Sequence, residues 1–310
     1  MKNTNTKIKV VGIGGSGCNA ISRMKKCNIN GVEMIVINTD IQDLKKANAD
    51  LKLRIGQKLT QGLGTGMNPE IGRKAAEEQR TEISELLKGA DMVFITGGEG
   101  GGTCTGAAPV VAEIAKQSGA LTIAIVTKPF SFEGNLRQKT AEIGIKNLKR
   151  KVDSLVYIQN DKLLEALDSK TTVLNAFWIC DDILRQAVQG LSDLIMLPGI
   201  INVDFADVKA IMENSGTALF GVGKAQGAQR AKEAALAAIN SPLLDFSCRG
   251  AKGILFNISG GKDISLSEID EAAKIICQEV NPEAKVIFGA VQSEILKKGE
   301  IKVSVIATGF

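Results

Sequence analysis

Three glycine-rich stretches are the parts of this sequence with the clearest capacity for chemistry. They read GIGGSGCN at 12–19, GLGTGMNP at 62–69 and GGEGGGTCTG at 97–106, and each precedes a predicted helix. Glycine lets backbone N–H groups approach a polyanion, and the N-terminus of the following helix favours negative charge. Because three such turns would serve one domain, we interpret them as a site for a nucleotide polyphosphate. The alternative is that the glycines only make tight turns.

Two well-known phosphate motifs narrow the type of nucleotide site. The first stretch satisfies GxGxxG at Gly12, Gly14 and Gly17, and Asp40 follows the second predicted strand about where a ribose-binding acid would stand. This pattern alone allows a dinucleotide-dependent dehydrogenase, but it leaves the other two glycine stretches unexplained. The P-loop motif is excluded, because neither Gly-Lys step is followed by Ser or Thr. Any triphosphate would therefore be held by backbone amides, helix ends and a metal ion.

A pair of acids in the stretch NVDFADV is the second candidate for chemistry. Asp204 and Asp207 stand three residues apart at an expected helix start, so both carboxylates can face the same way. Such carboxylates could orient an attacking water and help to place Mg²⁺. On the residues alone, the favoured interpretation is that they are acidic caps on a helix N-terminus.

Composition excludes several classes of protein. The 310 residues include 44% apolar and 23% charged residues, which is ordinary for a soluble globular chain. The net charge of +4 is spread out, so no nucleic-acid partner is expected. There is no histidine, and the six cysteines form no CxxC pair, which argues against zinc and against a histidine-based triad. Scattered thiols suggest a reducing cytoplasm, and the apolar runs are too short for direct membrane insertion.

Apolar runs and helical periodicity alternate along the first 160 residues. Repeated strand–helix units of this kind predict a parallel sheet with helices on both faces. One helix should open with Asn68 as cap and Pro69 in its first position, and continue far enough to place Ile83 and Leu87 on its buried face. Strands are predicted at 7–13, 34–38, 51–55, 91–96, 121–127 and 155–158, and a further helix at 107–117.

A long helix and a second α/β pattern complete the chain. The helix should cover 172–197 and stop at the Pro-Gly pair that follows. Strands at 217–222, 253–259, 285–291 and 301–308, with helices at 229–239 and 266–279, predict a smaller α/β domain with a four-stranded sheet. The fold class is therefore α/β. The predicted parts are a Rossmann-like nucleotide-binding domain at 1–171, a central connecting helix at 172–198 and a C-terminal domain at 199–310.

The stretch GGGTCTG at 100–106 resembles the GGGTGTG signature of the tubulin/FtsZ GTPases. Other segments resemble the FtsZ branch of that family in the same order along the chain, and together they cover about residues 7–310. These segments are VVGIGGSGCNA, INTD, GLGTGMNPEIG, TKPFSFEG, NDKLLE, AVQGLSDLI, NVDFADV, SPLL and VIATGF. The resemblance implies GTP or GDP as ligand in the first domain, with Mg²⁺ bound mainly through the phosphates.

The resemblance also assigns roles to residues of the first domain. It implies phosphate contacts for Gly14, Gly15 and the loop that contains Gly101, Gly102, Thr103, Cys104, Thr105 and Gly106. The loop with Thr65 and Gly66 would sense the γ-phosphate, and Glu133 and Arg137 would contact ribose and phosphate. Asn19, Phe177 and Asp181 would hold guanine, although on the residues alone Phe177 would be a core residue and Asp181 a solvated one.

For the stretch NVDFADV, the resemblance favours a catalytic role for the two acids over a role as helix caps. Asn202, Asp204 and Asp207 resemble the loop that one FtsZ subunit inserts into the nucleotide site of its neighbour. This implies a homopolymer assembled head to tail, GTP hydrolysis completed by the neighbouring subunit, and cell division in the cytoplasm at the division site. Division-ring regulators and membrane tethers are expected partners, although the tail peptide that docks tethers in the family does not follow VIATGF here.

The sequence departs from the family pattern around the expected phosphates. Cys104 replaces a glycine, Glu99 an apolar residue, and Thr65 and Met67 small alanines. Cys104 is strained if its φ is positive, and tolerated if φ is negative and the thiol points into the sheet. Glu99 repels phosphate unless it faces outward or the metal. These changes leave open an FtsZ-like scaffold that binds nucleotide and assembles with weak or no hydrolysis.

Overall fold

The computed structural model describes residues 6–27, 29, 31–166, 170–241, 250–293 and 296–310. Within this part of the chain, residues 6–188 and 189–310 form two compact units, and each is considered by itself. The units divide inside a long helix, α8 (Val173–Met196), which the sequence predicts almost to the residue. The predicted domain limits at 171/172 and 198/199 remain predictions.

The first unit is built on a parallel sheet. Its strands lie in the order β3-β2-β1-β4-β5-β6, with every pairing parallel, as predicted. In this register Ile13 at the end of β1 stands opposite Gly97 of β4. The first and third glycine stretches therefore leave the sheet from neighbouring strand ends. The bounds are β1 Ile8–Ile13, β2 Val32–Asn38, β3 Leu51–Arg54, β4 Met92–Gly98, β5 Leu121–Lys128 and β6 Ser154–Gln159.

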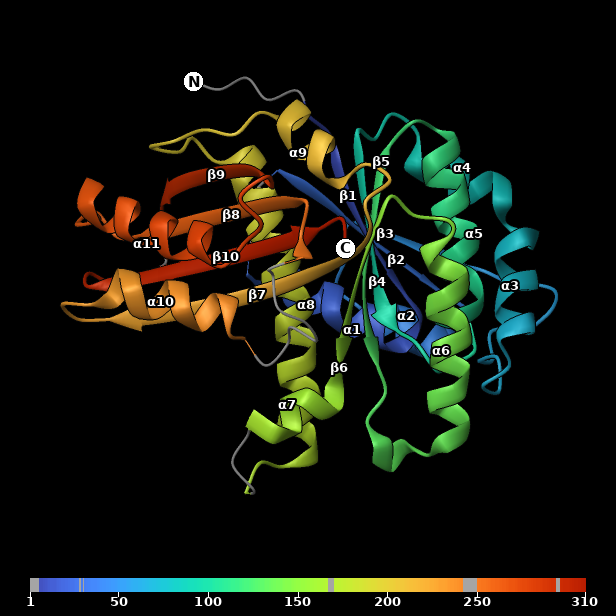
Figure 1. Ribbon diagram of the computed structural model, residues 1–310. Helices are drawn as coiled ribbons and strands as arrows, with labels where there is room; N and C mark the ends of the chain where they lie inside the picture. The colour runs from blue at the N-terminus through green and yellow to red at the C-terminus, as the bar shows by residue number, and fades with distance from the viewer. Residues whose placement is uncertain (1–5, 28, 30, 167–169, 242–249, 294–295) are drawn as a thin grey trace. The chain divides into compact units, whose positions relative to one another are not determined.

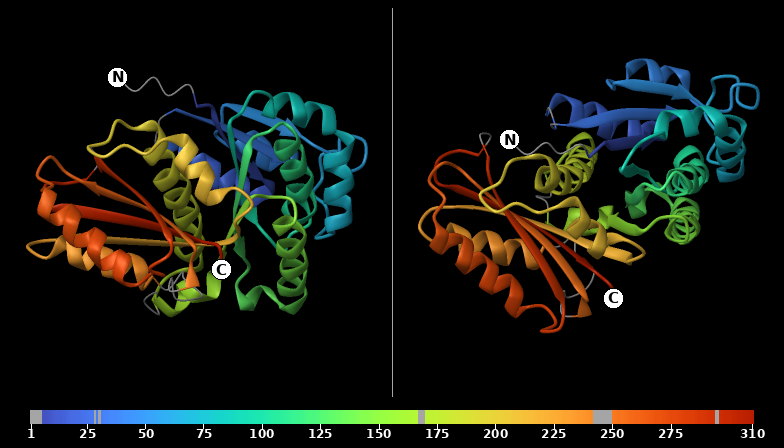
Figure 2. Two further views of the ribbon diagram at one scale, coloured as in Figure 1. Left: turned by 45° about the horizontal axis from the view of Figure 1, so that its top comes forward. Right: turned by 90° about the horizontal axis from the view of Figure 1, so that it is seen from above.

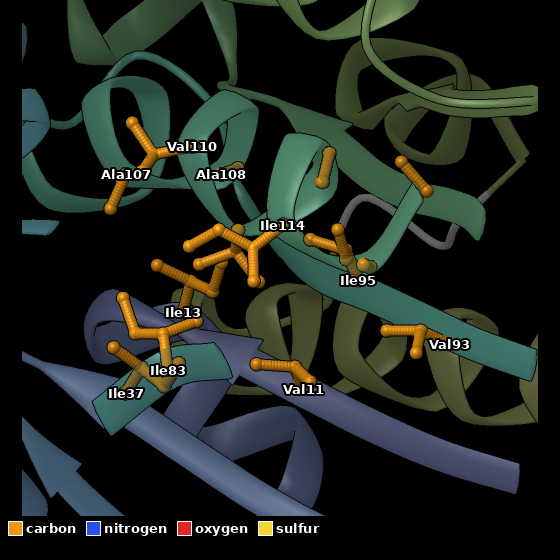
Figure 3. Close-up of a cluster of buried hydrophobic side chains, with 14 of the residues drawn as sticks. Val11, Ile13, Ile37, Ile83, Val93, Ile95, Ala107, Ala108, Val110 and Ile114 are labelled. Carbon is orange, nitrogen blue, oxygen red and sulfur yellow. The ribbon is translucent and has the colours of Figure 1, made fainter. Parts of the chain in front are cut away.

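Helices cover the sheet of this unit and bury its apolar side chains. They are α1 Gly14–Lys26, α2 Ile41–Lys46, α3 Pro69–Glu78, α4 Arg80–Leu87, α5 Thr103–Gln117, α6 Asn135–Lys149 and α7 Asn160–Ala166, with a short 3₁₀ turn at Ser131–Glu133 (Figure 1). Figure 3 shows how the strand residues Val11, Ile13 and Ile95 meet Ala107 and Ile114 of α5 in one buried cluster. Removal of this apolar surface from water is the main stabilising contribution to the unit.

The helix predicted to open at Pro69 is correct at its start and wrong in its length. Asn68 caps it, since its side chain accepts a hydrogen bond from the N–H of Glu70 at 2.9 Å. The helix then breaks at Gln79, whose φ of −107° and ψ of 28° are not helical. The buried Gln79 side chain turns inward instead, and its Oε1 accepts a hydrogen bond from the N–H of Gly56 at 2.6 Å. Two helices, α3 and α4, result.

Helix α5 begins four residues earlier than the sequence predicts, at Thr103 rather than Ala107. The third glycine stretch therefore runs directly into the helix and forms its first turn. This turn packs closely on α3: a Cβ at Gly106 would lie 1.9 Å from the carbonyl oxygen of Pro69 and 2.5 Å from the nitrogen of Arg73. The absence of a side chain at Gly106 is thus required by helix packing.

The second unit is a smaller α/β body with a mixed sheet. Its strands lie in the order β7-β10-β8-β9; β10 is antiparallel to β7 and β8, whereas β8 and β9 are parallel. Helices α10 and α11 lie side by side against the sheet (Figure 2), and an apolar cluster fills the space between. The bounds are α9 Phe205–Met212, β7 Gly216–Gln226, α10 Arg230–Ile239, β8 Gly253–Gly260, α11 Leu266–Gln278, β9 Lys285–Gln292 and β10 Glu300–Thr308.

This unit confirms the predicted four-stranded α/β pattern. The sequence signal for the start of α11 is local, because Ser265 and Glu268, three residues apart, form a reciprocal capping box. None of the helices in the described parts of the chain is long and apolar enough to cross a membrane.

The close contact between α3 and α5 gives a direct test of the fold. Gly106→Ala should lower the free energy of unfolding by about 1–3 kcal/mol, because the new methyl group must displace backbone of α3. Gly64→Ala is the matched control, since a Cβ at Gly64 has no atom within 4 Å and should change stability by no more than about 0.5 kcal/mol. Urea unfolding without nucleotide measures both, and equal effects would contradict this packing.

Candidate nucleotide-binding site

A cavity of about 380 Å³ lies where the parallel strands of the first unit end. It opens between the ends of β1 and β4, where the strand order reverses direction, which is the usual place for a ligand in an open α/β sheet. Its walls come from segments far apart in the sequence. The lining residues are Ile13, Gly14, Gly15, Ser16, Asn19, Gly98, Glu99, Gly101, Gly102, Thr103, Cys104, Thr127, Pro129, Glu133, Arg137, Asn160, Phe177, Cys180 and Asp181.

Two helix N-termini meet at one end of this cavity. Helix α1 begins at Gly14, directly after β1, and α5 begins at Thr103, a short loop after the end of β4. Gly14 has a φ of 72°, which favours glycine, and a Cβ there would lie 3.4 Å from the nitrogen of Cys104. The first N–H groups of a helix have no partner within the helix, and the helix dipole adds about 0.3–1 kcal/mol of attraction for an anion. This end can therefore hold phosphate groups on backbone donors.

Threonine hydroxyls fix the start of α5 in place. The Oγ1 of Thr103 lies 2.9 Å from the Oγ1 of Thr39 and 3.4 Å from that of Thr65. Thr65 thus reaches the phosphate loop from the second glycine stretch without lining the cavity. Its neighbours Gly66 and Met67 both have positive φ, 57° and 61°; the value at Met67 is uncommon for a residue with a side chain.

Aromatic and polar side chains form the other end of the cavity. Phe177 packs edge-on against Phe130, with ring centroids 5.2 Å apart, and remains 39% exposed, so its ring can receive a flat base. Asn19 and Asp181 lie at the same cavity. Burial raises the pKa of Asp181 to about 6, while the guanidinium of Arg23 opposes that rise.

An ion pair also lines the cavity. Arg137 on α6 donates from Nη1 to Glu133, four residues earlier. Glu133 is held in turn by the N–H of Phe130, which donates to Oε1 at 2.9 Å. Both side chains line the cavity, so the pair can present a carboxylate to sugar hydroxyls and a guanidinium to phosphate oxygens.

Only some of the site residues predicted from the sequence line the cavity. Gly14, Gly15, Asn19, Gly101, Gly102, Thr103, Cys104, Glu133, Arg137, Phe177 and Asp181 line the cavity, whereas Thr65, Gly66, Thr105 and Gly106 do not. Thr105 stabilises the loop instead, since its Oγ1 accepts a hydrogen bond from the N–H of Gly100 at 2.9 Å. The interpretation of Phe177 as a core residue is wrong.

Several lining residues were missed by the sequence-based reasoning. Ser16 and Gly98 belong to the glycine stretches already identified, while Thr127 and Asn160 follow the pattern of polar residues at the ends of parallel strands β5 and β6. That position is a usable signal, because the carboxyl ends of such strands share one edge of the sheet. Cys180 carries no comparable signal.

The side chain of Cys104 is accommodated against the end of β4. It is buried and is absent from the residues with positive φ, so the favourable alternative of the sequence analysis is confirmed. A Cβ at Gly97 would lie 2.5 Å from its Sγ, which means that the glycine at 97 leaves room for the thiol. The Sγ lies 3.8 Å from Oε1 of Glu99.

The side chain of Glu99 faces neither outward nor toward a metal position in the cavity, the two orientations expected from the sequence. Its carboxyl group is turned into the protein against α6, where a Cβ at Gly144 would lie 2.1 Å from Oε2. Oε2 has no hydrogen-bond partner within the described residues. Burial raises the pKa of Glu99 to about 7, and hydrogen bonds from Thr105 and Cys104 oppose this rise. A large fraction of the carboxyl is thus neutral near pH 7, which reduces its repulsion of phosphate.

The predicted catalytic residues belong to the second unit. Asn202 accepts a hydrogen bond at Oδ1 from the N–H of Gly199 at 2.9 Å. Asp204 occupies the N-cap position of α9, but its side chain makes no capping hydrogen bond. Asp207 lies in the first turn of that helix, and both carboxylates are exposed to solvent. Asp204 thus stands at the helix N-terminus, as the capping interpretation requires, but makes no capping hydrogen bond.

Comparisons with known proteins agree with this fold. Residues 7–168 match the model of the tubulin/FtsZ family GTPase domain, and residues 216–310 match that of the FtsZ family C-terminal domain. The structure is similar to that of an empty FtsZ dimer from M. jannaschii, with 47% identity, a TM-score of 0.95 and coverage of 99% of this chain and 89% of that chain. The fold and cavity thus define a protein of the FtsZ-like GTPase class.

More distant structures share the fold. CetZ1 from Haloferax volcanii, a GDP-bound monomer, has 20% identity and a TM-score of 0.83, with coverage of 98% of this chain and 94% of that chain. CetZ2 from the same organism, a GTPγS-bound protofilament, has 22% identity and a TM-score of 0.81, with coverage of 97% and 92%. Taken with the family models and the 47% identity to FtsZ, the chain belongs to the tubulin/FtsZ family.

The buried carboxyl of Glu99 predicts a specific dependence of stability on pH. The folded protein keeps this proton up to about pH 7, whereas the unfolded chain releases it near pH 4.3. Stability should therefore fall as the pH rises between these values, by on the order of 4 kcal/mol. Glu99→Gln keeps the shape without the charge, so its unfolding free energy from urea titrations should not show this decline.

Glu113, an acid on α5, provides the control. Lys151 and Arg80 lower the pKa of Glu113, so Glu113→Gln should remove stability at neutral pH and leave the decline caused by Glu99 in place. Curves for wild type and Glu99→Gln that run parallel from pH 5 to pH 8 would contradict the buried, protonated carboxyl.

Proposed function

We propose that this protein binds GTP in the cavity of the first unit and hydrolyses it when a neighbouring copy supplies Asn202, Asp204 and Asp207. The observation that carries the proposal is the meeting of two helix N-termini with a base-sized pocket at one sheet edge. The triphosphate would lie on the backbone donors of α1 and α5, and the base between Phe177 and Asp181. Family membership supports GTP as the nucleotide.

The acids around the cavity support the proposal that a second copy completes the site. Among the described residues, Glu99, Glu133 and Asp181 are the lining carboxylates. Glu133 pairs with Arg137, Asp181 pairs with Arg23, and Glu99 faces the interior. None of the three is placed to orient a water molecule at a terminal phosphate. Asp204 and Asp207 are exposed carboxylates of the kind this step requires.

Magnesium fits this arrangement through the nucleotide rather than through a protein cage. No group of three acidic, histidine or cysteine side chains within the described residues could hold a metal ion. Mg²⁺ commonly keeps several waters and binds substrate phosphates with few protein ligands. When bound, it would neutralise part of the phosphate charge, with the hydroxyl of Thr103 at the same end of the cavity.

A shared active site predicts filaments. When one face carries the nucleotide and another face carries the acids, subunits stack head to tail, and such a contact does not close. The solved relatives include an FtsZ dimer and a CetZ2 protofilament, which supports assembly of this chain. We further propose a role in cell division in the cytoplasm at the division site, with regulators and membrane tethers as partners.

One observation favours the second candidate function, a scaffold with weak hydrolysis. The loop expected to sense the γ-phosphate carries two consecutive residues of positive φ, Gly66 and Met67, and the Met67 side chain is 47% exposed. A strained backbone here can hold this loop in one conformation whatever the state of the γ-phosphate. Slow phosphate release with normal assembly would select this alternative.

Loss of Asp207 should separate hydrolysis from binding. Asp207→Ala is expected to lower phosphate release at least a hundredfold while the affinity for a fluorescent GTP analogue stays within about twofold of wild type. Glu213→Ala is the control, because Glu213 is an acid at the other end of α9 that pairs with Lys209. A rate per wild-type subunit that stays flat as protein concentration crosses the assembly threshold would contradict the shared site.

Mixing two inactive variants tests the sharing directly. Asp207→Ala keeps the pocket and loses the acid, whereas Asp181→Ala keeps the acid and loses the pocket. In a random one-to-one filament, about a quarter of the contacts pair an intact pocket with an intact acid loop, so phosphate release should return. Mixed filaments, verified by electron microscopy, that remain inactive would contradict hydrolysis across the contact.

A further inference from the structure

An arginine outside the predicted site holds the acid at the base end of the cavity. The Nε of Arg23 on α1 donates to Oδ2 of Asp181 on α8 at 2.9 Å. The pair is partly shielded from solvent, since the side chains are 29% and 11% exposed. Arg23 follows Asn19 by four residues, so both lie on the same face of α1. This face of α1 therefore supplies both a lining residue and the partner of another lining residue.

An aromatic ring orders the arginine from the other side. The guanidinium carbon of Arg23 lies 5.5 Å from the centroid of the Trp178 ring, within the range of a cation–π contact. Trp178 is half exposed and directly follows Phe177, which lines the cavity. The arginine is thus held between a carboxylate and an indole, and its planar group cannot rotate freely.

The ion pair opposes the effect of burial on the charge of Asp181. A carboxylate in a shielded position tends to take up a proton, and burial alone would raise the pKa of Asp181 further than the value of about 6 that it has beside Arg23. Other ionisable groups around this part of the cavity are Cys180, Glu133 and Arg137. The Cys180 thiol has its pKa raised to about 12 and stays neutral, while Glu133 and Arg137 pair with each other.

We propose that Arg23 is a positioning residue for base selection, which keeps the Asp181 carboxylate ionised and fixed in orientation beside the cavity. This inference rests on the proposed function, because it needs a purine base at Phe177. An ionised carboxylate only accepts hydrogen bonds, and guanine presents two donors on one edge, N1–H and the 2-amino group. A protonated carboxyl would lose acceptor capacity and present a donor to that edge.

The same argument explains the cost of losing the arginine. Without it, the buried carboxyl would be neutral over more of the physiological pH range, and guanine would lose its advantage over bases that lack the 2-amino group. Hydrogen bonds to charged groups are worth about 1.5–3 kcal/mol, which corresponds to roughly tenfold or more in affinity. Inosine diphosphate is the matched probe, since hypoxanthine differs from guanine only by that amino group.

The experiment measures the affinities of GDP and inosine diphosphate for wild type, Arg23→Gln, Arg23→Lys and Arg185→Gln between pH 6 and pH 8.5. Arg185 is the control: it pairs with Asp182 in the same helix at 2.7 Å, and neither residue lines the cavity. Titration of the phosphates and of Glu99 is common to all four proteins, so differences between them report on Asp181. Circular dichroism checks that each variant is folded.

We expect Arg23→Gln to weaken GDP binding roughly fivefold or more at pH 6.5, and by less than about twofold at pH 8.5, where Asp181 is ionised even without its partner. Its preference for GDP over inosine diphosphate should shrink at pH 6.5. Arg23→Lys should restore most of the wild-type profile, and Arg185→Gln should match wild type throughout.

Two results would overturn the inference while leaving the proposed function intact. One is an Arg23→Gln profile that is parallel to wild type at every pH, which would mean a merely structural role. The other is an unchanged preference between the two nucleotides at pH 6.5. Failure of the wild-type protein to bind GDP at any pH would instead refute the proposed function itself.

Discussion

The close approach of the first turn of α5 to the ends of β1 and β4 is the constraint on which this site depends. It brings the unpaired N–H groups of α1 and α5 to one place, and it leaves no space for side chains at several positions. A Cβ at Gly97 in β4 would lie 2.5 Å from the Sγ of Cys104, and one at Gly14, directly after β1, would lie 3.4 Å from the nitrogen of Cys104. The glycines therefore serve two purposes: they allow the packing, and the packing creates the anion site.

The substitutions near this turn are consistent with the same constraint. Cys104 fits because Gly97 opposite it has no side chain, and Glu99 fits because Gly144 leaves room on α6. The side chains of these two residues are thus buried and contact each other. The cost is a buried carboxyl whose proton is bound more tightly than in the unfolded chain.

The sequence predicts most of the fold because its signals are local. Alternating apolar runs locate the strands, Asn68 and Pro69 locate the start of α3, and Ser265 with Glu268 locates the start of α11. The errors arise where a distant contact decides the outcome. Helix α3 ends because Gln79 bonds to Gly56, a residue 23 positions away, and no local pattern announces that interaction.

In the candidate site, too, local sequence patterns predict some features and distant contacts determine the others. Glycine spacing predicts a phosphate cradle, and family resemblance predicts Asn19, Phe177 and Asp181 as residues for the base, all of which line the cavity. The orientations of Cys104 and Glu99 depend on the space left by other segments, so the sequence leaves them open. The contact of Arg23 with Asp181 joins residues 158 positions apart, and only the folded chain makes it visible.

The central claim is that backbone amides at the start of α5 hold the phosphates of a guanine nucleotide. Backbone NMR of the first unit's amide signals during titration of the whole protein with GDP tests it most directly. We predict large shifts for Gly101, Gly102, Thr103 and Cys104, together with those for Gly14 and Gly15, which saturate with one nucleotide per chain. Saturating shifts confined to other segments, with these six amides unmoved, would contradict it.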